Sequence, residues 1–263
     1  MRRLAVLLVF ALSITSLALA DDWNKTYTVS ANPELRVGTS DASIHVTTWD
    51  RNTIEARVTT EGYKIGEGGI RIIEQQTGNT VSIEVKFPHE TFFNFGYHRR
   101  NVEITIQMPR VGNANLRTAD GSITLSGLKG NMDVNTSDGS LQIEGVDGSL
   151  RAHTSDGRIT ASGRFDTLSL NTSDGRIDAT ALAGSRLNGE WDLHTSDGGV
   201  TLRIPSTLSA DVELRTGDGR IDFDVPITTQ GAIGRNRING KLNGGGNLIS
   251  VHTSDGSIHI GRS

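Results

Sequence analysis

Aspartate residues recur at a fixed spacing in the second half of the chain. The motif Thr-Ser-Asp-Gly, or a close variant of it, occurs seven times, and a degenerate copy lies at residues 39–42. In the first four copies the aspartates are each 18 residues apart, and a fixed period of this size is the signature of a repeat architecture. The Asp-Gly pairs are Asp120, Gly121, Asp138, Gly139, Asp156, Gly157, Asp174, Gly175, Asp197, Gly198, Asp218, Gly219, Asp255 and Gly256.

Calcium is the ligand that a stacked row of carboxylates would suit. The calcium-binding nonapeptide repeat needs a glycine-rich turn at every half coil, and this sequence does not follow that pattern. An aspartate that hydrogen-bonds the backbone of its own turn, followed by a glycine that tolerates positive φ, explains the motif without a ligand. We therefore interpret the row as structural turn residues, predict no metal site and expect the chain to fold without calcium. A calcium-stabilised repeat roll is the alternative.

Other residues with catalytic or metal-binding potential belong to the same repeat. His153, His194 and His252 each precede the threonine of a motif. His153 and His194 would lie two strand spacings apart, about 9.6 Å, which is too far to share one metal ion. A glycosidase needs one particular pair of carboxylates, whereas here every repeat has the same aspartate, and no nucleophile motif accompanies the serines. The sequence predicts a protein that is not an enzyme and has no cofactor; a carbohydrate-active β-helix enzyme is the alternative.

One segment, residues 87–100, does not follow the repeat. It holds four of the seven phenylalanines and is bounded by turn residues. Aromatic and arginine side chains are the usual anchors of recognition, so we predict a projecting loop that contributes to partner binding or self-association. A hydrophobic plug over the core is the alternative. The predicted binding residues are Phe92, Phe93, Phe95, Tyr97, Arg99 and Arg100.

The elements that position these residues are short strands. In residues 132–149 apolar and polar side chains alternate on both sides of the motif, which indicates two strands that each have one apolar face. A β-meander and a solenoid both fit such a unit. The solenoid is favoured because stacking would align near-identical apolar rows and place the motif threonines on the buried side. The first row is Val134, Ala152, Leu170, Leu193, Leu214 and Val251, and the second is Ile123, Leu141, Ile159, Ile177, Val200, Ile221 and Ile258.

The predicted fold is therefore all-β: a single elongated β-solenoid of stacked parallel coils, with about 18 residues per regular coil. Residues 113–263 form the regular coils, and residues 21–112 form an irregular N-terminal β cap of the same domain. The spacing between aspartates lengthens to 23, 21 and 37 residues in the later repeats, so we expect loops or a degenerate coil around residues 181–190 and 228–248.

The composition indicates export. Residues 1–20 have two arginines, an apolar run and a small-residue end, the pattern of a secretory signal peptide. Its removal would leave 24 basic against 30 acidic side chains, which argues against a nucleic-acid partner. No later segment could span a bilayer. The chain has no cysteine, which excludes disulfides, thiol catalysis and cysteine-based metal sites.

The sequence also resembles a family. The repeated T-S-D-G-x-I motif, residues 46–51 (VTTWDR), Met108-Pro109-Arg110 and the glycine-rich stretch at residues 244–249 before the last repeat together resemble the bacterial putative-adhesin family of β-strand-repeat proteins, a domain of unknown function. The resemblance covers nearly all of the chain after residue 20. It implies a β-solenoid, an exported or envelope location, and no shared catalytic residues.

We therefore expect a non-enzymatic exported scaffold for adhesin-like interactions at the cell envelope or surface. It would be periplasmic, associated with the outer envelope, or extracellular. A protein or an envelope polysaccharide is the expected partner, and self-association through the aromatic segment is a further possibility.

Overall fold

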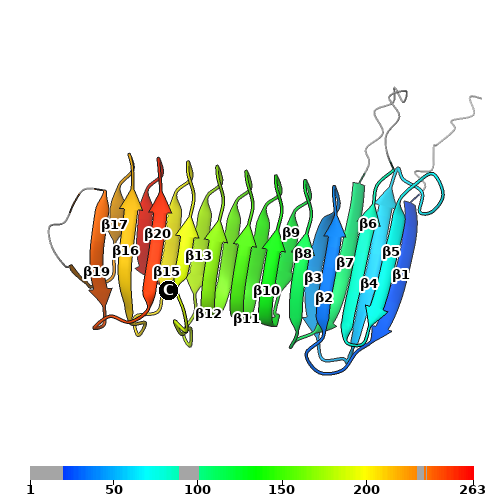
Figure 1. Ribbon diagram of the computed structural model, residues 1–263, viewed down its shortest axis with the longest axis horizontal. Helices are drawn as coiled ribbons and strands as arrows, with labels where there is room; N and C mark the ends of the chain where they lie inside the picture. Colours follow the sequence, from blue (N-terminus) through cyan, green and yellow to red (C-terminus); the bar gives the residue numbers. More distant parts are fainter. Residues whose placement is uncertain (1–19, 89–100, 230–233, 235) are drawn as a thin grey trace, which may run out of the picture.

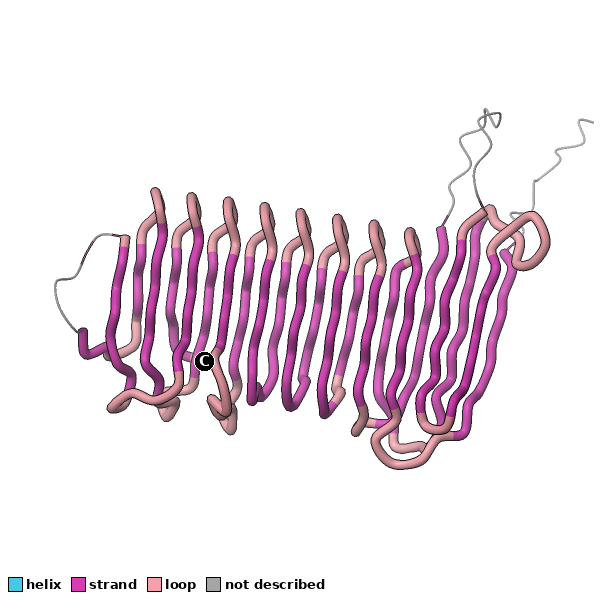
Figure 2. The backbone as a smooth tube through the Cα atoms, in the orientation of Figure 1, coloured by secondary structure: helices cyan, strands magenta, loops and turns pink. Residues whose placement is uncertain are grey.

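The computed structural model describes residues 20–88, 101–229, 234 and 236–263. In this part of the chain the regular structure is entirely β and comprises 21 strands. No helix there is long and apolar enough to cross a membrane. The strands stack side by side into an elongated body with a row of similar turns along one edge (Figure 1 and Figure 2).

A single coil contains β10 (Lys129–Asn135), the turn at residues 136–139 and β11 (Leu141–His153). Val134 of β10 pairs in parallel with Ala152 in the second half of β11, as the repeat predicts, and not as a hairpin with the strand that begins at Leu141. Leu141 pairs in parallel with Ile159 in the next coil. Each coil therefore contributes one strand to each of two parallel layers.

The second bend of a coil, around Asp147 and Gly148, is not a turn between two strands. There β11 continues as one bent strand. The bend coincides with register shifts after Ile143 and after Gly148, and Gly145 and Gly148 have positive φ angles of 63° and 129°. Irregularities of this kind bend a strand without ending its pairing, so the same strand passes from one layer to the other.

The strands follow one another through the two layers in spatial order. Layer one consists of β5 (Arg71–Thr77), β6 (Thr80–Lys86), β2 (Glu34–Thr39), β8 (Asn113–Arg117), β10, the second halves of β11 and β12 (Ile159–Asn171), β14 (Trp191–His194), β20 (Leu248–Thr253), β16 (Ala210–Thr216), β19 (Arg237–Leu242) and β18 (Ile227–Thr229). Layer two consists of β1 (Ala20–Thr28), β4 (Thr53–Glu61), β7 (Asn101–Pro109), β3 (Ser43–Trp49), β9 (Ile123–Ser126), the first halves of β11 and β12, β13 (Ile177–Ala181), β15 (Val200–Ile204), β21 (Ile258–Arg262) and β17 (Ile221–Phe223).

The coils at both ends are out of chain order. The coil of β2 and β3 lies between the strands β6 and β7 and the coil of β8 and β9. At the other end, the last coil, β20 and β21, is inserted between β14 and β15 and the earlier coil of β16 and β17. The long spacing before Asp255 therefore does not mark a degenerate coil. It contains β18 and β19, which pair antiparallel with each other, and β19 also covers the edge of β16.

The core lies between the layers. The two predicted apolar rows are buried there, with Val251 between Leu193 and Leu214 in space. Phe165 and Trp191 fill the interior where the repeat lengthens, and their rings meet edge to face with centroids 6.1 Å apart. The open end near the N-terminus is closed by antiparallel strands, and Glu74 of β5 links the two layers by accepting hydrogen bonds from Lys25 and Tyr27 of β1.

Candidate binding surface

Threonine, not aspartate, forms the hydrogen bonds inside the repeated turns. The Thr136 side chain is 3% exposed. Its hydroxyl oxygen lies 2.9 Å from the Ala119 carbonyl oxygen and 3.0 Å from that of Gly121, in the turn of the neighbouring coil, and accepts the N–H of Gly139 at 3.3 Å. The same pattern recurs from the Thr118 turn to the Thr253 turn. The threonines therefore connect consecutive turns as well as closing their own.

Glycine is required in these turns by close stacking. Gly139 does not have a positive φ, contrary to the reason for which the sequence suggested a glycine. A Cβ atom at this position would lie 1.9 Å from the carbonyl oxygen of Gly121, and the value is 1.8 or 1.9 Å at the equivalent glycines. Because this neighbour is backbone of the adjacent turn, a side chain would force the turns apart.

The aspartates of the turns form an exposed row, which we call the aspartate ridge. Its members are Asp41, Asp120, Asp138, Asp156, Asp174, Asp197, Asp255 and Asp218, in spatial order. A hydrogen bond with Asp41 is the largest cause that raises the pKa of Asp120, and desolvation and the negative charges of Asp41 and Asp138 raise it further. Within the described residues, the carboxylates from Asp138 onward accept no hydrogen bond, and no three His, Cys, Asp or Glu side chains are grouped as a metal site would require.

His153, His194 and His252 lie on the outer face of layer one. His153 and His194 are separated by the strand of Asn171, as the sequence predicts. His194 is also the direct neighbour of His252, and their rings stack with centroids 5.0 Å apart. Burial lowers the pKa of His252, and His194 and Arg215 lower it further. The sequence missed this contact because the last coil is inserted out of order.

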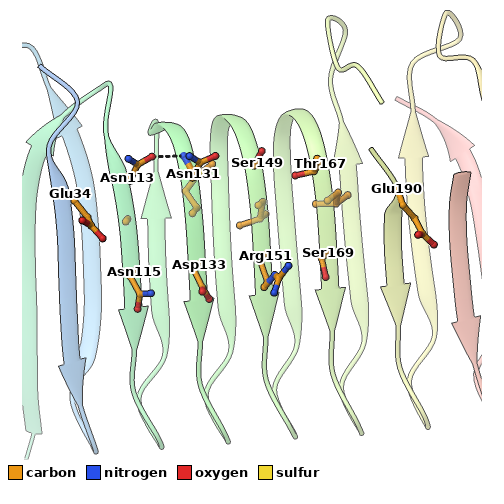
Figure 3. Close-up of a pocket in the computed structure, with 14 residues that line it drawn as sticks. Glu34, Asn113, Asn115, Asn131, Asp133, Ser149, Arg151, Thr167, Ser169 and Glu190 are labelled. Carbon is orange, nitrogen blue, oxygen red and sulfur yellow. Dashed lines mark hydrogen bonds between the residues drawn. The ribbon is translucent and has the colours of Figure 1, made fainter. Parts of the chain in front are cut away.

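A groove of about 670 Å³ hollows the outer face of layer one (Figure 3). Its polar lining forms two rows that run across the strands. The first row is Glu34, Asn113, Asn131, Ser149, Thr167 and Glu190, and the second is Asn115, Asp133, Arg151 and Ser169. Neighbours within a row are separated by one strand spacing, about 4.8 Å.

The long acidic side chains stand at the two ends of the groove, and short hydroxyl side chains lie between them (Figure 3). Glu34 accepts a hydrogen bond from Arg36 at 2.8 Å and one from Thr80 at 3.2 Å. The bond from Arg36 is the main cause that lowers the pKa of Glu34, against the opposing effect of burial. Glu34 is therefore held in its charged form.

Most polar side chains in the groove have no partner within the described part of the protein. Asn113 accepts the N–H of Asn131 at 3.0 Å, and Asp133 accepts from Asn135. Among the described residues, no hydrogen bond or ion pair of the side chain is found for Asn115, Asn131, Ser149, Arg151, Thr167, Ser169 or Glu190. These donors and acceptors face the open groove and are available to a ligand.

This groove was not predicted from the sequence. Its polar lining residues occupy outward strand positions, apart from Glu190 directly before β14, and a polar side chain is ordinary at such positions. The usable signal was the run of Asn, Ser and Thr at equivalent outward positions of successive repeats. The six predicted binding residues at positions 92–100 lie outside the described residues, so their role remains a prediction.

The fold and the groove together define an all-β, solenoid-like repeat protein with a polar groove on one face. The chain belongs to the Toastrack DUF4097 family, whose model matches residues 21–261. This family membership agrees with the domain of unknown function that the sequence resembles.

Solved structures with similar folds come from several bacteria. A putative cell adhesion protein from Clostridium sporogenes is 13% identical, with 92% of this chain and 100% of that chain covered and a TM-score of 0.40. A putative adhesin from Bacteroides fragilis is 12% identical, with 92% of this chain and 97% of that chain covered and a TM-score of 0.44. A putative lipid binding protein from Parabacteroides distasonis is 15% identical, with 91% of this chain and 96% of that chain covered and a TM-score of 0.42. No curated protein matches the chain.

Proposed function

We propose that this chain is exported after removal of residues 1–20 and acts, without catalysis, as an adhesin-like interaction scaffold of the cell envelope or surface. The scaffold is a single unit, residues 21–263, with regular coils of about 18 residues, the spacing of the first four motifs. The observation that carries the proposal is the groove on layer one, where unpaired hydrogen-bonding groups face outward from strands that are paired on both sides.

The groove does not favour the alternative of a glycoside hydrolase. Glu34 and Glu190 stand at opposite ends, five strand spacings or about 24 Å apart. Glu34 and Asp133 lie two strands apart and are offset by two residues along the strand, which gives a separation of about 12 Å. The two carboxylates of a catalytic pair are separated by about 5–9.5 Å. A general acid also needs a raised pKa, and the pKa of Glu34 is lowered by Arg36.

Two serines of β12 provide a matched test. Ser169 lines the groove in layer one, and Ser162 faces outward from layer two on the same strand. Labelled protein comprising residues 21–263 would be incubated with intact bacterial cells, and bound protein would be counted by flow cytometry. We expect Ser169→Trp to abolish binding because the indole fills the groove, while Ser162→Trp binds like the wild type. Equal binding by the two variants, at equal melting temperatures, would contradict the proposal, as would absence of wild-type binding.

A further inference from the structure

We infer that the groove on layer one binds an extended, neutral polysaccharide chain that lies across the strands. This inference rests on the proposed function and names the ligand class for the same site. Its first support is translational repetition. The groove presents similar polar groups at one strand spacing after another, and a periodic row of this kind matches a polymer with repeating units better than a small compact ligand.

The chemistry of the lining selects hydroxyl-rich ligands. Asn115 and Asn131 each offer a carbonyl acceptor and an amide donor, and Ser149, Thr167 and Ser169 offer hydroxyls that both donate and accept. None of these five side chains has a partner within the described protein. Sugar hydroxyls are also both donors and acceptors, so a glycan can satisfy these groups whichever way each is oriented.

The charge of the groove excludes strongly anionic polymers. Three carboxylates, Glu34, Asp133 and Glu190, line it, and among the described residues Arg151 is the one lining cation. Arg36 lies beside Glu34 and neutralises it, which leaves a groove of small net negative charge. A nucleic acid or an acidic polysaccharide requires a positive surface, and this groove would repel it.

Within the described residues, the groove offers little of what a protein or lipid partner would use. Protein interfaces centre on buried aromatic or arginine anchors, whereas the lining has no aromatic side chain and its single arginine, Arg151, is exposed. Lipid chains need an apolar lining. The large hydrophobic side chains exposed in the described residues are Ile73, Val111 and Leu182, and none of them lines the groove. The apolar lining residues, such as Met132 and Leu150, are buried beneath the strands. Recognition must therefore proceed through hydrogen bonds.

Binding would be measured by isothermal titration with neutral β-linked oligosaccharides, cello- and chito-oligosaccharides, and with polygalacturonate as the anionic comparison. We expect the neutral oligosaccharides to bind with an affinity that changes little between low and high salt. Asn115→Ala combined with Asn131→Ala removes two to four hydrogen bonds to the ligand and should weaken binding about tenfold or more. Each hydrogen bond contributes a factor of about three to ten in affinity. Ser169→Trp should abolish binding, and Ser162→Trp should leave it unchanged.

Three results would overturn the inference: no neutral oligosaccharide binds, Ser169→Trp binds them as the wild type does, or polygalacturonate binds more tightly with strong salt dependence. The outcomes are separable from those of the cell assay. Cell binding that requires the groove but is not competed by the oligosaccharides would leave the scaffold function standing and refute the glycan. Oligosaccharide binding without cell binding would support the glycan as ligand and refute the scaffold function.

Discussion

Replacement of Thr136 by valine tests whether the threonine hydroxyls hold the stacked turns together. Valine keeps the shape of the side chain and removes the oxygen. The buried N–H of Gly139 then loses its acceptor, and the carbonyl of Gly121 loses a donor. The Ala119 carbonyl still accepts the N–H groups of Ser137 and Asp138. One unsatisfied buried group costs about 1–3 kcal/mol.

The assay is urea unfolding followed by circular dichroism, with amide hydrogen exchange at Gly139 to locate the loss. A cost of 1 kcal/mol corresponds to a fall in Tm of about 2–4 °C for a domain of this size. Asp138→Asn is the matched control, because the Asp138 carboxylate accepts no hydrogen bond in the described structure and has like charges one strand away on either side. We expect this variant to equal or exceed the wild type in stability, most clearly at low salt. Wild-type stability of Thr136→Val would contradict this role of the hydroxyl, as would a loss of stability in Asp138→Asn as large as that in the valine variant.

Three further predictions concern the turn glycines, the Lys25–Glu74 pair and divalent cations. Gly157→Ala should lose much stability, because its Cβ would lie 1.9 Å from the Gly139 carbonyl oxygen. Gly145→Ala is the control for backbone strain, because φ is positive there but no atom lies within 4 Å of the added Cβ. Thermal unfolding would compare the two variants, and equal losses of stability would refute the clash. Hydrogen bonding from Lys25 lowers the pKa of Glu74, so the stability that ionised Glu74 contributes is present at neutral pH and is lost as the pH falls below the ordinary glutamate value of 4.5. Glu74→Gln should lower stability at pH 7 by at most about 1 kcal/mol, since the pair is partly exposed, and should flatten the acid side of the curve of stability against pH. An unchanged curve would contradict a stabilising Lys25–Glu74 pair. Removal of divalent cations by a chelator should leave Tm unchanged. A bound ion would stabilise the native state by mass action, so a fall in Tm of more than a few degrees would support an ion-filled roll.

The sequence predicted the parallel stacking of the repeats because each repeat carries its own alternation. Val134 and Ala152 occupy equivalent positions, and they are paired. The burial of the threonines followed from the same alternation. The order of the terminal coils could not be predicted, because Val251 fits equally well beside Leu193 or Leu214, and it contacts the strands of both.

The candidate site depended on features that a repeat pattern does not contain. Alternation indicates that Ser149 and Ser169 face outward, but not that this part of layer one is hollowed between Glu34 and Glu190. The glycines of the turns were predicted correctly as turn residues, but the expected reason, a positive φ angle, was incorrect. Gly139 is required because it lies against Gly121 of the neighbouring coil. Contacts between coils appear only when the coils are stacked in space.

Site-specific photo-crosslinking would show whether the groove on layer one is the surface by which the protein contacts its partner. A photoreactive phenylalanine analogue would replace Ser169 in one variant and Ser162 in another, and each protein of residues 21–263 would be irradiated on intact bacterial cells. A small outward residue is replaced in both, so the two probes differ mainly in the layer from which they project. We predict that the probe at position 169 forms adducts with cell-surface material and that the probe at 162 does not. Adducts from position 162 alone, or equally from both positions, would show that the contact surface lies elsewhere.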